Sequence, residues 1–181
     1  MLQRSFVPIA LVLFSANIAL AQLPEPKAPV IPEADGYIVI PKAAVRPEKN
    51  HVYKAIFEAT QFPDDPKAIL PVLNNAGSEL NALSVEGVPK KNWKFAVVFH
   101  GPAIDGILDD EHYKAKYHTG NPNLNVLSAF KREGVEIFVC GQNLAGLKLD
   151  PSAISHDVTV ASDALIVLMK YQNMGYALLS F

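Results

Sequence analysis

From residue 51 onward, short apolar segments alternate with amphipathic ones, and this alternation constrains the fold more than any other feature. Helix patterns or helix caps separate each apolar segment from the next. The segments that read as strands span residues 53–60, 95–99, 136–140, 158–160 and 176–181. Strands separated by helices are joined by right-handed crossovers and form a mostly parallel sheet. The sequence therefore predicts a three-layer α/β/α domain with a five-stranded, mostly parallel sheet and helices on both faces.

Three of the intervening segments carry clear helix signals. Apolar residues recur at steps of three and four over residues 69–83, as in an amphipathic helix, and Pro71 fits the first turn. A second helix is expected over residues 121–133, with Asn121 as its cap and Pro122 in its first turn. A third, strongly apolar helix is expected over residues 163–174.

The first 21 residues have the pattern of a secretory signal peptide. Arg4 precedes an apolar run over residues 6–14, and Ala19-Leu20-Ala21 forms a small-x-small cleavage site before Gln22. The apolar run is far shorter than the roughly 20 residues that a transmembrane helix needs. We therefore expect a periplasmic or secreted protein that begins at Gln22 and has no membrane association after cleavage.

Residues 22–50 carry six prolines and read as an extended leader, because proline removes backbone donors and disfavours regular structure. Within this leader only residues 37–40 (YIVI) are expected to dock, as an edge strand. The folded α/β domain is predicted to span residues 51–181.

Charge and motifs exclude several classes of function. The mature chain has 15 Lys and Arg against 18 Asp and Glu, a net charge of −3, and so lacks the basic footprint of a nucleic-acid-binding protein. It contains no glycine-rich phosphate loop, no GxSxG motif and no CxxC motif. Nucleotide cofactors, serine hydrolysis and thioredoxin-like redox chemistry have no support, and we expect no cofactor.

The single cysteine, Cys140, ends a predicted strand. In open α/β sheets ligands bind beyond the carboxyl ends of the strands. The turn Gly141-Gln142-Asn143 opens the next helix, whose free N–H groups and positive dipole end favour a thiolate. Gly141 also leaves space for a ligand or a second sulfur to approach the backbone. The alternative is that Cys140 is a small buried apolar residue.

His100 ends the neighbouring predicted strand in the run FAVVFHGPA, so it is expected on the same rim as Cys140. It can donate or accept a proton, or pair with a thiolate. The alternative is a structural histidine that hydrogen-bonds to the following loop.

The segment between His100 and Asn121 is long and rich in Asp, His and Tyr. His112 and His118, with the acidic residues 109–111, raise the hypothesis of a metal site. Their spacing matches no strong ligand signature, so we expect a solvated, partly helical loop and no metal.

Four segments resemble the DsrE/DsrF-like proteins, and most closely their exported, uncharacterised branch. These segments are VVFHGPA, NPNL, GVEIFVCGQ and QNMGYALL, and the resemblance covers residues 53–181. It implies a five-stranded parallel sheet and assembly into dimers, trimers or hexamers. Cytoplasmic members of the wider family pass sulfur along a relay as a cysteine persulfide. The resemblance places their sulfur-carrying cysteine, at the end of the third strand, at Cys140.

Two functional hypotheses follow. In the first, the protein is a periplasmic sulfur carrier or transferase that holds a persulfide or small sulfur species on Cys140, with His100 beside it. The partner is then a small sulfur species or a sulfur-carrier protein. The residues expected around that species are Gly101, Asn121, Gly141, Gln142 and Asn143. In the second, the protein is a non-catalytic oligomeric binding or assembly module, and its cysteine is structural.

A homo-oligomer is expected from the last helix. Residues 165–169 are five consecutive apolar residues, which cover more than one face of a helix. A single sheet can bury only one of those faces, so we expect the other, or the final strand, to meet a second copy of the chain.

Overall fold

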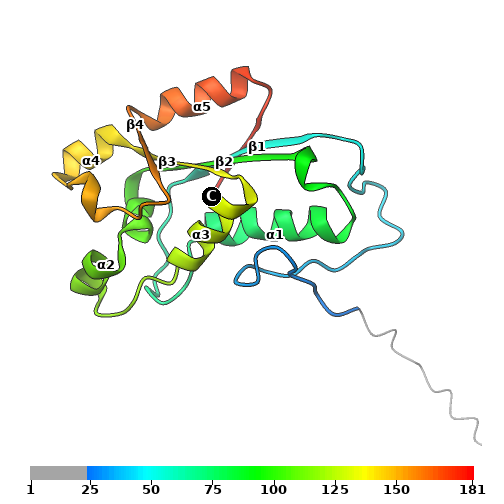
Figure 1. Ribbon diagram of the computed structural model, residues 1–181, viewed down its shortest axis with the longest axis horizontal. Helices are drawn as coiled ribbons and strands as arrows, with labels where there is room; N and C mark the ends of the chain where they lie inside the picture. The colour runs from blue at the N-terminus through cyan, green and yellow to red at the C-terminus, as the bar shows by residue number, and fades with distance from the viewer. Residues whose placement is uncertain (1–23) are drawn as a thin grey trace, which may run out of the picture.

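The computed structural model describes residues 24–181 and confirms the α/β fold (Figure 1). The five strands are all parallel and lie in the order β4-β3-β2-β1-β5. Their bounds are β1 Tyr53–Ala59, β2 Trp93–Phe99, β3 Glu136–Cys140, β4 Thr159–Ala161 and β5 Ala177–Ser180. The predicted signal peptide and its cleavage site lie outside the described residues.

The helices cover both faces of the sheet, as predicted. Their bounds are α1 Pro71–Val85, α2 Asp110–Tyr117, α3 Leu124–Glu133, α4 Gly141–Leu147 and α5 Ala164–Asn173. Figure 1 shows α1 and α3 on one face and α5 on the other, with α2 and α4 beyond the carboxyl ends of β2 and β3. Among residues 24–181, no helix is both long and apolar enough to span a membrane.

The main core lies between the sheet and the helices α1 and α3. Helix α1 begins at Pro71, and the apolar stripe expected from its sequence is buried. The strand β2 is buried along nearly its whole length, as expected of a central strand with helices on both faces. A short apolar run thereby fixes the middle of the sheet.

A second, smaller core lies under α5. Asp163 caps this helix through its carboxylate, which accepts the N–H of Leu165 at 2.6 Å. The residues that α5 buries against the sheet are Ala164, Val167, Leu168 and Tyr171. Within residues 24–181, α5 is the only helix that packs on this face, and its opposite side is exposed.

The leader docks differently from the prediction. Residues 37–40 do not form an edge strand, because Tyr37 pairs only with Lys27 in an isolated antiparallel bridge. Ile31 and Ala34 are buried instead, against α1. Gly77 of α1 permits this contact, because a Cβ there would lie 2.6 Å from the Cβ of Ala34. The leader therefore contributes to the main core.

The segment before α3 also differs in detail. The helix begins at Leu124 rather than at the Asn121-Pro122 step, and Asn121 is not its cap. The C-terminal end is as predicted, since Gly134 takes a left-handed conformation with φ of 81°. Upstream, the long segment is partly helical, and Tyr113 of α2 is buried with its hydroxyl donating to the carbonyl of Pro66 at 2.6 Å.

Candidate functional site

The carboxyl ends of β2 and β3 bring His100 and Cys140 to one edge of the sheet. Phe99 pairs with Val139, so His100 and Cys140 occupy the next register position. His100 keeps an extended backbone, with φ of −154° and ψ of 172°. Adjacent strands are about 4.8 Å apart, and alternation along β2 puts His100 on the same face as Val98, which packs with Cys140 under α5. The two predicted catalytic residues are therefore neighbours.

Cys140 is almost fully buried in the single chain, with 5% of its surface exposed. It packs in the small core under α5 with Ile56, Ala96 and Val98. It is also the residue that precedes α4, so the first N–H groups of that helix lie beside it. The sulfur is therefore largely shielded from solvent in the single chain.

His100 is bonded to a carboxylate that the sequence analysis missed. Its Nε2 lies 3.0 Å from Oε1 of Glu58, the one carboxylate of β1, and both side chains are mostly buried. The second oxygen of Glu58 accepts the hydroxyl of Ser180 at 2.7 Å. A charged residue in the otherwise apolar end of the run YKAIFEA was the sequence signal for this role.

Two of the predicted ligand-binding residues meet at this edge. The N–H of Gly101 donates to Oδ1 of Asn143 at 3.0 Å, which ties the end of β2 to the start of α4. Both residues line a cavity of about 330 Å³. The other residues that line it are Pro102, Asp105, Lys116 and Leu147. Neither Cys140 nor His100 is among them.

Charged groups on one side of this cavity are paired with one another. Lys116 Nζ lies 2.7 Å from both oxygens of Asp105, and the hydroxyl of Tyr117 donates to the same carboxylate at 2.5 Å. Burial, followed by this hydrogen bond to Asp105, raises the pKa of Tyr117 well above its ordinary value. The tyrosine therefore stays a neutral donor at physiological pH.

Gly141 and Gln142 contact the neighbouring strand rather than open space. A Cβ on Gly141 would lie 2.7 Å from the carbonyl oxygen of Ala161, so the expected room for a ligand is filled on that side by backbone. Gln142 Nε2 donates to the carbonyl of Ser162 at 3.3 Å. Both residues hold the start of α4 against the end of β4.

Asn121 is buried and orders the loop before α3. Its Nδ2 donates to the carbonyls of Gly106 and Leu108 at 3.1 and 2.6 Å. Its Oδ1 accepts from the backbone and the side chain of Asn123, both at 2.9 Å. Both polar atoms of the Asn121 side chain are therefore hydrogen-bonded within the protein.

The histidines of the long segment do not come together around a metal. His112 Nδ1 lies 2.8 Å from Asp109 Oδ1, and His118 ends α2 in a left-handed conformation. Among residues 24–181, no group of three His, Cys, Asp or Glu side chains could hold a metal ion. The metal hypothesis receives no support from these positions.

Comparisons with known proteins agree with the fold. The model of the DsrE/DsrF-like family matches residues 67–181. The solved structure of MTH1491 from Methanobacterium thermoautotrophicum, described as a protein of unknown function, is similar with a TM-score of 0.55 and 17% identity, over 71% of this chain and 99% of that one. The ychN protein of E. coli is similar with a TM-score of 0.53 and 14% identity, over 72% of this chain and 100% of that one. No curated protein matches the sequence. Identities this low show a shared fold alone.

Proposed function

Because the chain belongs to the DsrE/DsrF-like family, we propose that it is a sulfur-handling protein of the periplasm that holds or transfers a persulfide or a small sulfur species on Cys140. The observation that carries the proposal is the position of Cys140, which ends β3 beside His100 at the carboxyl edge of the sheet. The resemblance places the sulfur-carrying cysteine of cytoplasmic relay members at this same position. The N-terminal sequence supports the periplasmic location.

The chemistry is thiolate attack on a sulfane sulfur. The Cys140 thiolate forms a new S–S bond with the outer sulfur of a persulfide or polysulfide donor while the donor's own S–S bond breaks, and the rest of the donor leaves as a thiolate or as a shorter polysulfide anion. An acceptor thiolate then takes the outer sulfur and regenerates the Cys140 thiolate. His100, the next register position to Cys140 on the adjacent strand, is the group that exchanges the thiol proton in this proposal.

The intact mass of the purified mature protein tests this function. After incubation with inorganic polysulfide, we expect an added mass of one or more sulfur atoms that a reducing agent removes. Cys140→Ser is the matched control, because the chain has no second cysteine. An unchanged wild-type mass, with full labelling of Cys140 only after denaturation, would reject sulfur handling on this residue.

The burial of Cys140 favours a second candidate, an oligomeric binding or assembly module in which the cysteine is structural. In that case Cys140→Ser places a hydroxyl in an apolar core and lowers the free energy of unfolding by about 1–3 kcal/mol, with no loss of a sulfur-dependent reaction. The sulfur-handling function predicts instead that the same variant loses the mass increase completely.

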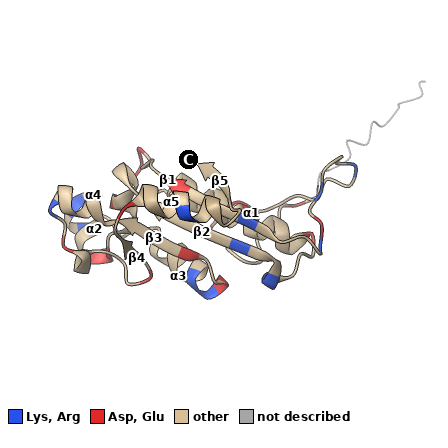
Figure 2. Ribbon diagram, turned by 90° about the horizontal axis from the view of Figure 1, so that it is seen from above, with Lys and Arg blue, Asp and Glu red and all other residues tan. Residues whose placement is uncertain are grey.

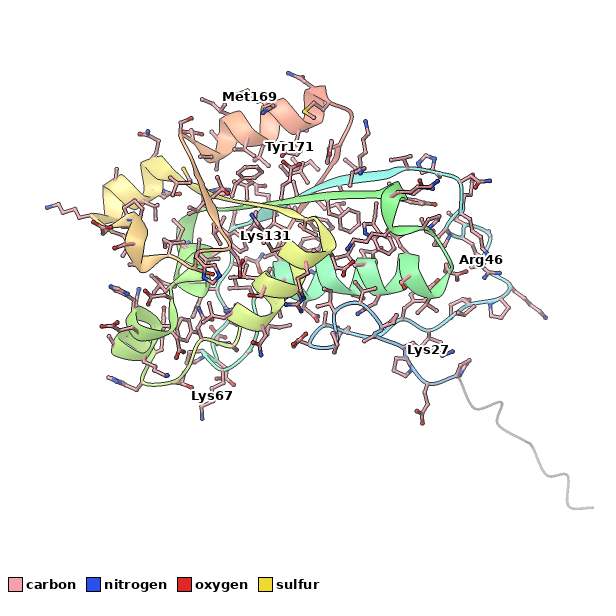
Figure 3. All side chains as sticks on the ribbon, viewed as in Figure 1. Lys27, Arg46, Lys67, Lys131, Met169 and Tyr171 are labelled. Carbon is pink, nitrogen blue, oxygen red and sulfur yellow. The ribbon has the colours of Figure 1, made fainter. Side chains whose placement is uncertain are left out.

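A second copy of the chain is part of the proposal for either function. Leu165, Ile166 and Met169 lie on the outer side of α5 and are 59%, 55% and 56% exposed. Figure 2 looks down on α5 and shows it mostly uncharged, and Figure 3 shows Met169 directed away from the sheet and Tyr171 toward it. The leader already covers part of α1 on the opposite face. We therefore place the contact between copies on the outer side of α5.

A further inference from the structure

Glu58 joins three separate parts of the chain through its two carboxylate oxygens. Oε1 faces Nε2 of His100 at 3.0 Å, and Oε2 accepts the hydroxyl of Ser180 at 2.7 Å. The two side chains of the His100–Glu58 pair are 23% and 18% exposed, so solvent screens the pair only in part. The Ser180 bond fixes the carboxylate, and the carboxylate in turn fixes the imidazole ring.

The pairing also fixes which ring nitrogen carries the proton. An ionised carboxylate can only accept hydrogen bonds, so Nε2 of His100 must be the protonated nitrogen when it faces Glu58. In the neutral ring the lone pair is then on Nδ1. Among residues 24–181, the only hydrogen bond of the His100 ring is the one at Nε2, and Nδ1 forms none with Cys140 or with any other group. Cys140 occupies the neighbouring register position on the same face of the sheet.

We propose that Glu58, held by Ser180, is a positioning residue that presents Nδ1 of His100 as the base for the Cys140 thiol. The proposal rests on the proposed function and adds a positioning residue to the same site. The S–H bond of Cys140 breaks as an N–H bond forms at Nδ1, which gives a thiolate and an imidazolium. The Glu58 carboxylate balances the positive ring, and no further reactant is required.

The side chain of Glu58 is not needed to pair the strands β1 and β5. The backbone holds β5 and its extension to β1 without help from this side chain, because the N–H of Phe181 donates to the carbonyl of Glu58 at 3.1 Å. The N–H of Thr60 donates in turn to the carbonyl of Phe181 at 3.2 Å. A purely structural Glu58 could therefore be replaced by Gln with little effect, whereas a positioning Glu58 could not.

The test is the rate at which iodoacetamide alkylates Cys140 in the folded mature protein at pH 7. For Glu58→Gln and for His100→Gln we expect a fall of about tenfold or more, and for the double variant no further fall, because the two residues act as one unit. Ser180→Ala should give a smaller fall of about threefold. Glu111→Gln, an exposed substitution on α2, is the matched control and should leave the rate unchanged.

The histidine tautomer provides a second readout that a structural role would not affect. In ¹⁵N-histidine spectra of the wild type, His100 should carry its proton on Nε2, and Glu58→Ala should produce a mixture of tautomers. A proton on Nδ1 in the wild type would overturn the positioning role, as would additive losses in the double variant or an unchanged rate in Glu58→Gln. A wild-type thiol that is not alkylated in the folded state would instead overturn the proposed function, and the proton transfer with it.

Discussion

Asn81 of α1 binds both backbone groups of Ile31 in the leader. Its Oδ1 accepts the N–H of Ile31 at 2.9 Å, and its Nδ2 donates to the Ile31 carbonyl at 3.0 Å. The same side chain also bonds the N–H of Val30 and the carbonyl of Asp35. Asn81 and Ile31 are both fully buried, so the backbone groups of Ile31 have no access to water as an alternative partner. One amide side chain thereby anchors the proline-rich segment to the domain.

Asn81→Ala should lower the free energy of unfolding by about 2 kcal/mol or more, because it leaves the buried N–H of Ile31 unpaired and removes three further hydrogen bonds. Urea denaturation followed by circular dichroism measures the change. Asn74→Ala is the matched control, since it removes an exposed pair of hydrogen bonds with Asp35 and should cost less than about 1 kcal/mol. Equal effects of the two variants would contradict the anchoring role of Asn81.

Gly141→Ala should destabilise the protein by about 1–3 kcal/mol, because the new Cβ would lie 2.7 Å from the Ala161 carbonyl oxygen and force β4 away from α4. Gly146 belongs to the same helix and has no atom within 4 Å of an added Cβ. Gly146→Ala should therefore stabilise the protein by up to about 1 kcal/mol through helix propensity. Thermal unfolding of both variants checks that the two substitutions change stability in opposite directions. If both stabilise the protein, β4 can move to accommodate the added Cβ at Gly141 without cost.

Acid should weaken the attachment of the leader to the domain, because Glu86 of the connection after α1 pairs with Arg46 of the leader. The hydrogen bond from Arg46, at 2.6 Å, is the main reason that the pKa of Glu86 lies below its usual value of 4.5, and Tyr37 adds a second bond. The pKa of Glu86 is lower in the folded state than in the unfolded state. The stability that ionised Glu86 contributes is therefore present above about pH 4.5 and is lost as the pH falls through the folded-state pKa. Glu86→Gln should therefore lose less stability than the wild type between about pH 6 and pH 3 in urea titrations.

The matched control for that measurement is Glu33→Gln, an exposed substitution in the same leader. It should follow the wild-type acid curve. If Glu86→Gln follows that curve as well, the pair with Arg46 does not couple the leader to pH.

Met169→Lys should dissociate the homo-oligomer, because it places a charge in the centre of the apolar outer side of α5. Light scattering on the mature protein should show a fall to the monomer mass with an unchanged circular dichroism spectrum. Val45→Lys is the control, since Val45 is an apolar side chain that is 90% exposed in the leader, beside residues of the core between α1 and the sheet. A monomeric wild type would contradict the interface outright.

The elements that the sequence predicted best are those with strong apolar runs. The strand β3 has the predicted bounds, and α1 begins at the predicted proline. The docking of the leader was missed because it depends on one buried amide, Asn81, that meets a segment about 50 residues away. Proline content indicated only that this segment has no regular structure, and Ile31 carried no periodic signal.

The candidate site was predicted in part. The rule that ligands gather at the carboxyl ends of parallel strands placed His100 and Cys140 at one edge, where the structure has them side by side. Glu58 and Ser180 were missed because their proximity follows from the strand order, in which β1 lies between β2 and β5. The strand order cannot be read from a sequence in which the strands merely follow one another.

The pairing of β1 with β5 also sets the order of events during folding. Glu58 and Ser180 are 122 positions apart, so closing this contact costs more chain entropy than closing the contacts between β1 and β2. We expect β5 to join the sheet late and to make refolding slow. Until it does, β1 has an open edge of unpaired backbone groups beside the apolar side chains of Ile56 and Phe57. The folding chain is then most prone to aggregate, and low protein concentration should raise the yield of refolding.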